Sequence, residues 1–130
     1  MPYEIIWEAR GVVKRHHGFL AADELLAASR EIQSDPRFDD LRYIINDFLD
    51  VEGHAIDRAA IEYFACLRIG AAQINRQVLS PFVATREPGL TIGTLLQAPL
   101  YENGHPVRIF PTLTEARAWV SSHLAQWWSY

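Results

Sequence analysis

The fold is decided by one stretch in the middle of the chain, Leu41-Arg42-Tyr43-Ile44-Ile45-Asn46. This stretch is nearly all apolar apart from Arg42. Strands that helices cover on both faces have such a composition, because neither face meets water. We therefore predict a strand over residues 41–46, in the centre of a parallel sheet.

Two further strand-like runs follow, Phe82–Thr85 and Val107–Phe110, and each of the three runs leads into a helix-like segment. This repeated alternation predicts parallel strands joined by right-handed crossovers. Earlier in the chain, Tyr3–Glu8 alternates between apolar and polar residues, and an extended pattern resumes at Val12–His17. The expected fold class is α/β, with a mixed, mostly parallel sheet, an N-terminal antiparallel strand pair and four helices.

Four segments have helical patterns. The first runs from Leu20 to Ser34, and the third from Pro88 to about Leu100. The second follows a loop over residues 47–54, with Asp57 as its predicted N-cap, and the fourth starts at the capping box Thr112-Leu113-Thr114-Glu115. In the second helix the spacing predicts a core-facing stripe of Ile56, Ala60, Tyr63 or Phe64, Leu67, Ala71 and Ile74.

Composition limits the classes of protein to consider. The chain has 130 residues, 49% of them hydrophobic, which suits a single domain over residues 1–130. Its net charge of −4 argues against nucleic-acid binding, which needs a cationic surface. Its one cysteine, Cys66, is expected to be a buried small side chain. Without a secretory signal or a bilayer-spanning run, we expect a cytoplasmic protein with no integral membrane association.

No catalytic signature is recognisable. Gly89 and Gly93 lack the lysine that follows the glycines of a nucleotide loop, and there is no serine elbow or paired-cysteine motif. Adjacent His16 and His17 are expected to point to opposite faces of a strand, as a polar pair at the sheet edge. We therefore expect no enzyme activity, no catalytic residues, no cofactor and no metal.

A candidate surface for a ligand or partner follows from the predicted topology. Ligands of open parallel sheets collect beyond the carboxyl ends of the strands. The side chains expected there are Asp47, Asp50, His54, Asp57, Thr85, Arg86 and Thr112.

The order of elements resembles the fold of the sulphate-transporter and anti-sigma-factor-antagonist domains, called STAS. The segment 35–47 and the run Val107–Phe110 followed by Glu115–Val120 look like the SpoIIAA-like group of uncharacterised bacterial STAS-like proteins. This resemblance implies one STAS-like domain that serves as a binding or regulatory module. Anti-sigma antagonists carry a phosphorylatable serine where the helix after the central strand begins. Here no serine or threonine occurs between Asp35 and Leu79, so that switch is absent.

Two functions are therefore expected. The first is a non-enzymatic module that contacts a regulatory protein partner, without a phosphorylation switch. The alternative is a carrier or sensor of a small apolar, lipid-like ligand, which the related Sec14-type lipid-carrier domains suggest.

A homodimer is also expected, because Trp127, Trp128 and Tyr130 lie beyond the core-facing stripe of the last helix. Packing of these side chains on their own core, or around a ligand, is the alternative.

Overall fold

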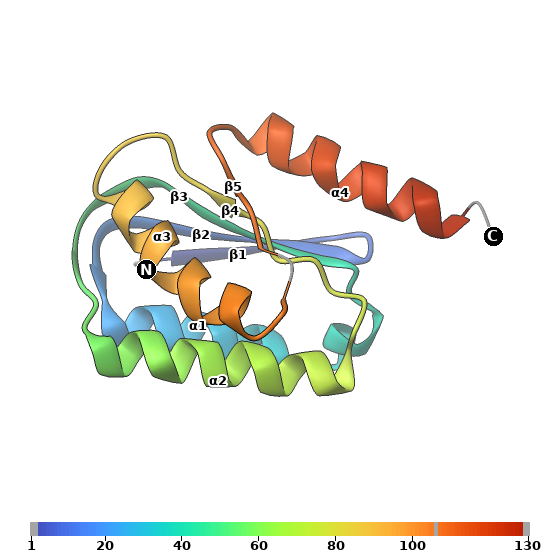
Figure 1. Ribbon diagram of the computed structural model, residues 1–130, viewed down its shortest axis with the longest axis horizontal. Helices are drawn as coiled ribbons and strands as arrows, with labels where there is room; N and C mark the ends of the chain where they lie inside the picture. The colour runs from blue at the N-terminus through green and yellow to red at the C-terminus, as the bar shows by residue number, and fades with distance from the viewer. Residues whose placement is uncertain (1–2, 106, 129–130) are drawn as a thin grey trace.

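The computed structural model describes residues 3–105 and 107–128, with side chains as far as Leu124. It is an α/β fold with a five-stranded mixed sheet and four α-helices (Figure 1). The elements follow in the order β1 (Tyr3–Glu8), β2 (Gly11–Ala21), α1 (Ala22–Ser34), the 3-10 helix η1 (Pro36–Asp40), β3 (Tyr43–Ala55), α2 (Arg58–Ile74), β4 (Phe82–Val83), α3 (Gly89–Glu102), β5 (Ile109–Phe110) and α4 (Leu113–Trp128).

The strands lie in the sheet in chain order, β1-β2-β3-β4-β5. The first pair, β1 with β2, is antiparallel, and β2–β3, β3–β4 and β4–β5 are all parallel. The predicted antiparallel pair and the predicted parallel pairing of the three later strands are both confirmed.

The central strand β3 is much longer than predicted. Residues 47–54, which we expected to form a loop, continue the strand as far as Ala55 and pair with the second half of β2. Acidic residues made this segment resemble a loop, but Phe48 and Val51 are buried within it. A strand that buries one face tolerates acidic residues on the other, so the loop prediction was wrong.

Helices cover both faces of the sheet. Figure 1 shows α1, α2 and α3 on one face, and α4 alone on the other. On β2 and β3, Val12 and Ile44 pack in the layer under α1 and α2, whereas Val13 and Ile45 pack with Ala116 of α4. Because side chains alternate along a strand, polar residues of β2 and β3 also lie in one of two separate layers, one under α1 and α2 and the other under α4.

The buried stripe of α2 differs from the predicted one. Ala60, Phe64 and Ala71 are buried as expected, but Arg68 is buried with them. Ile74, expected in the core, is 74% exposed. The helix turns so that position 68 lies between 64 and 71 on its inner face, which moves 67 to the margin and 74 outward.

Two further predictions about burial were wrong. Cys66 is exposed, because it lies off the inner face of α2. His16 is fully buried and not at a sheet edge, because β1 pairs outside β2 and covers it. Its ring stacks on Phe48 and lies 5.9 Å, centroid to centroid, from the Tyr3 ring.

The predicted helix starts are confirmed at two positions. Asp57 accepts a hydrogen bond of 2.8 Å from the backbone amide of Ala60 at the start of α2. Thr112 Oγ1 accepts one of 3.1 Å from the amide of Glu115 at the start of α4. Among the described helices, none is both long and apolar enough to cross a bilayer.

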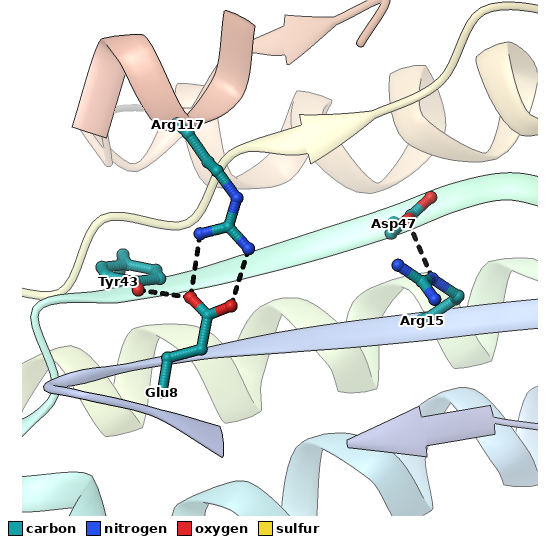
Figure 2. A network of polar contacts seen from close by, with 5 residues as sticks. All are labelled: Glu8, Arg15, Tyr43, Asp47 and Arg117. Carbon is teal, nitrogen blue, oxygen red and sulfur yellow. Dashed lines mark hydrogen bonds and ion pairs between the residues drawn. The ribbon is translucent and has the colours of Figure 1, made fainter. Parts of the chain in front are cut away.

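A polar contact fastens α4 to β1, the edge strand farthest from β5, as Figure 2 shows. The Arg117 guanidinium donates two hydrogen bonds, of 2.9 and 2.6 Å, to the carboxylate of Glu8 at the end of β1. The Tyr43 hydroxyl donates to the same carboxylate at 2.5 Å. Arg117 holds the pKa of Glu8 below its usual value, with a smaller contribution from Tyr43. This contact joins the first and last elements of the chain.

Candidate functional site

The predicted surface beyond the strand ends is distributed over several places. Asp47 lies within β3, on the α4 side, beside Val83 at the end of β4. Its Oδ2 accepts a 3.2 Å bond from Arg15 Nε (Figure 2). Its Oδ1 accepts a 2.9 Å bond from the backbone amide of Leu49. Asp47 is buried, so these bonds hold its carboxylate in place within the sheet.

Asp50 and His54 follow along β3, where their register partners are His17 and Leu20 of β2. The His54 Nδ1 accepts a bond from the amide of Ile56 at 3.2 Å. Asp57 caps α2, as described above. Asp50 and His54 therefore lie in the second half of β3, past the residues that pair with β4, and Asp57 lies at the start of α2.

Thr85, Arg86 and Thr112 gather where β4 and β5 end. The Thr85 hydroxyl donates to the carbonyl of Pro111, next to Thr112, and Arg86 is exposed. Within the described residues, no three histidine, cysteine, aspartate or glutamate side chains come close enough to hold a metal ion.

The interior layer under α1 and α2 contains charges that the sequence reasoning missed. Lys14 on β2 is 1% exposed, and its Nζ donates a 2.9 Å bond to Ser29 Oγ on α1. The same Nζ lies 5.2 Å from the centroid of the Phe64 ring. Burial lowers the pKa of Lys14 to about 7, with a further contribution from the positive charge of Arg68.

Arg68 lies one turn after Phe64 on α2 and is 7% exposed. Burial lowers its pKa to about 10. Within the described residues, its buried Nε and Nη1 atoms have no hydrogen-bond partner. A buried donor without an acceptor costs about 1–3 kcal/mol, and more when it is charged. The burial of these Arg68 donors without an acceptor therefore calls for an explanation, and a group bound beside them would supply the acceptor.

Asn46 and Ser80 add polar groups to the same layer. Asn46 Nδ2 donates to Ser80 Oγ at 2.9 Å, and both residues are buried. The Asn46 Oδ1 atom has no partner within the described part of the chain. Asn46 is the register partner of Lys14, so the polar groups come from the centre of the sheet.

A cavity of about 220 Å³ opens beside Arg68 and Ser80. It lies between the second half of α2, the approach to β4, the end of α3 and His123 of α4. Most of its remaining wall is apolar, from Ala72, Val78, Leu79, Leu100 and Val107. The cavity thus combines one buried guanidinium with an apolar wall.

A wider depression of about 690 Å³ adjoins this cavity. The two share His105, Val107 and His123 in their walls, and the depression adds Tyr101 and Trp119. The Trp119 and His123 rings lie 4.6 Å apart, centroid to centroid. Cavity and depression together are the candidate functional site.

The sequence contained a signal for both buried cations. Lys14 lies between Val12 and His16 on the face of β2 that meets α1 and α2, and Arg68 continues the spacing Ala60, Phe64 and Ala71. Charged residues at apolar positions are seldom fully buried. The predicted stripe has Leu67 where the structure has Arg68.

The predicted dimer contact depends on the side chains of Trp127, Trp128 and Tyr130, which lie outside the described part of the structure. Comparison with protein-family models, curated proteins and solved structures finds no match to this chain.

Proposed function

We propose that this protein is a non-enzymatic module that binds a small molecule in the cavity beside Arg68. This is the alternative predicted above, a carrier or sensor of a small ligand with an apolar part. The observation that supports it is the cavity of about 220 Å³, which has a mostly apolar wall beside Arg68 and shares His105, Val107 and His123 with the depression beside Trp119. Binding sites for small molecules combine apolar walls with a few polar groups in this way.

The volume also suits a small ligand. A cavity of about 150 Å³ lined by apolar side chains is enough to bind benzene. The present cavity is larger and adjoins a depression, so a molecule somewhat larger than benzene is of the right size. A ligand with a longer apolar tail has room to extend into the depression beside Trp119.

We further propose that the fold is STAS-like, of the SpoIIAA-like type. An antiparallel pair followed by three parallel pairings, with four helices, supports this assignment. The capping role of Asp57 supports a module without the phosphorylation switch of anti-sigma antagonists, since a carboxylate there bonds the first turn of α2.

Contact with a protein partner is a second proposal, and a different observation favours it. A groove of about 400 Å³ between α1 and α2 is lined by apolar residues that include Phe38, Leu67 and the exposed Ile74. Exposed apolar side chains beside a groove are typical of protein contacts. Ile74→Asp tests this proposal, because it would weaken such a contact without altering the cavity beside Arg68.

The experiment for small-molecule binding uses hexanoate and hexanamide as probes. Each is titrated into ¹⁵N-labelled protein, and amide shifts are followed by NMR. We expect shifts at residues around the cavity, and Ala72→Leu to abolish them by filling the space. Ala59→Leu is the matched control, since Ala59 is exposed on the same helix. If neither probe shifts these amides, or if Ala72→Leu leaves the shifts unchanged, the proposed function is wrong.

A further inference from the structure

Lys14 and Arg68 are buried in the interior layer under α1 and α2, and no carboxylate among the described residues is paired with either of them by an ion pair or a hydrogen bond. The buried carboxylate of the sheet, Asp47, is on the other face and is paired with Arg15. Because side chains alternate along β3, Asp47 has no access to the layer that holds Arg68.

Arg68 brings this uncompensated charge to the cavity wall. Its Nε and Nη1 are buried without acceptors within the described part of the chain, and the residue lines the cavity. A guanidinium keeps its charge at all ordinary pH values and presents several N–H donors in one plane. The group that pairs best with a guanidinium is a carboxylate, whose two oxygens accept from the two N–H donors along one edge, Nε with Nη2 or Nη1 with Nη2.

Ser80 supplies a second donor beside Arg68. Its Oγ accepts from Asn46 Nδ2, which leaves the hydroxyl hydrogen to donate to another group. Ser80 and Arg68 line the same cavity, so one anionic group has access to donors from α2 and from the segment before β4. His105 and Arg76 also line the cavity, so every ionisable side chain that the described residues contribute to its wall is a cation or a histidine.

We infer that the cavity takes a small monocarboxylate with an apolar body, and that Arg68 binds its carboxylate group. This inference rests on the proposed function, since it names the chemical class of the ligand in the same cavity. The apolar wall formed by Ala72, Leu79 and Leu100 contacts the body of the molecule. A free phosphate or sulfate has no apolar part to fill that wall.

Lys14 provides an independent measure of the bound charge, because it is the only lysine of the chain. The positive charge of Arg68 contributes to the low pKa of Lys14. A carboxylate bound to Arg68 offsets that charge, so it raises the pKa of Lys14, whereas an uncharged ligand does not. Protein labelled with ¹³C-lysine gives a single side-chain signal that reports this pKa.

The test compares hexanoate, hexanamide and inorganic phosphate. In the intact protein we expect hexanoate to bind about ten- to a hundredfold more tightly than hexanamide, as for hydrogen bonds to a charged group. Arg68→Met should remove this preference while hexanamide still binds. Arg58→Met is the matched control, because Arg58 is exposed on the same helix and should leave both affinities unchanged. Hexanoate, and not hexanamide, should raise the Lys14 pKa.

The outcomes separate this inference from the proposed function. Equal affinities of the unmodified protein for hexanoate and hexanamide, or a hexanoate preference that survives in Arg68→Met, would overturn the carboxylate site and leave small-molecule binding intact. Phosphate binding as tightly as hexanoate would show a general anion site and also overturn the inference. If neither hexanoate nor hexanamide binds, the proposed function fails with it. If Arg68→Met does not fold, the relative affinities of the unmodified protein for hexanoate and hexanamide, together with the Lys14 pKa in each complex, still test the inference.

Discussion

The Lys14 ammonium on β2 donates a 2.9 Å hydrogen bond to Ser29 Oγ on α1, inside the buried layer that also holds Arg68 and Asn46. The Ser29 hydroxyl in turn donates to the carbonyl of Leu25 at 3.3 Å. One neutral hydroxyl does not replace the water that a full charge loses on burial. The lysine therefore releases its proton more easily in the folded protein than in the unfolded chain.

The first prediction concerns this proton. The folded pKa is about 7 and the unfolded value is 10.5, so between these pH values the unfolded chain binds one more proton. The free energy of unfolding should therefore rise with pH over this window, by at most about 1.4 kcal/mol per pH unit. Lys14→Met should remove that rise. Urea unfolding of both proteins at several pH values measures it, and parallel pH curves would contradict the prediction.

The second prediction concerns acid. Burial, with smaller contributions from Lys14 and His17, lowers the pKa of His16 to about 3, below its unfolded value of 6.5. The unfolded chain then binds the extra proton between these values, so stability should fall as the pH falls from 6.5 toward 3. His16→Phe should flatten this loss, by at most about 1.4 kcal/mol per pH unit. His17→Phe is the control on the adjacent residue, and an equal flattening there would contradict the assignment.

The third prediction concerns the attachment of α4. Arg117→Met removes the two bonds to Glu8 that join this helix to the end of β1. Because the pair is partly exposed, we expect a loss of about 1 kcal/mol in unfolding free energy, with faster amide exchange in α4. Arg58→Met breaks an exposed pair within α2 and should cost less. Amide exchange measured by NMR that leaves α4 as protected as before would refute the role of Glu8.

The fourth prediction concerns the start of α2. Asp57→Ala removes the acceptor for the Ala60 amide and should cost about 1 kcal/mol. Asp57→Ser, which keeps an acceptor oxygen, should retain most of the stability. Thermal unfolding of the two variants gives the comparison, and equal losses would show that the cap contributes nothing.

The fifth prediction concerns self-association through Trp127, Trp128 and Tyr130, a contact proposed from the sequence of the last helix. Trp128→Ala should shift the protein from dimer to monomer while its secondary structure is kept, because burial of an indole contributes strongly to interfaces. Sedimentation equilibrium measures the molar mass. A protein that is monomeric before mutation at high micromolar concentration would rule out the dimer.

Local sequence patterns were enough for the parts of the fold that depend on neighbouring residues. The caps at Asp57 and Thr112 need only a hydrogen-bond acceptor and the amide three residues ahead, and both were predicted correctly. The parallel order of the later strands followed from strand–helix alternation, which depends on the order of segments along the chain and not on their packing. The length of β3 did not follow, because pairing with the far half of β2 decides it.

The α/β class, the antiparallel start and the parallel order of the later strands follow from patterns along the chain. Which polar side chains are buried depends on how whole elements pack against one another. Whether Arg68 or Leu67 faces the sheet depends on how α2 is rotated, and Lys14 is buried because α1 and α2 close over β2. Burial is a property of several elements packed together, so the cavity beside Arg68 exists only once residues more than fifty positions apart have met.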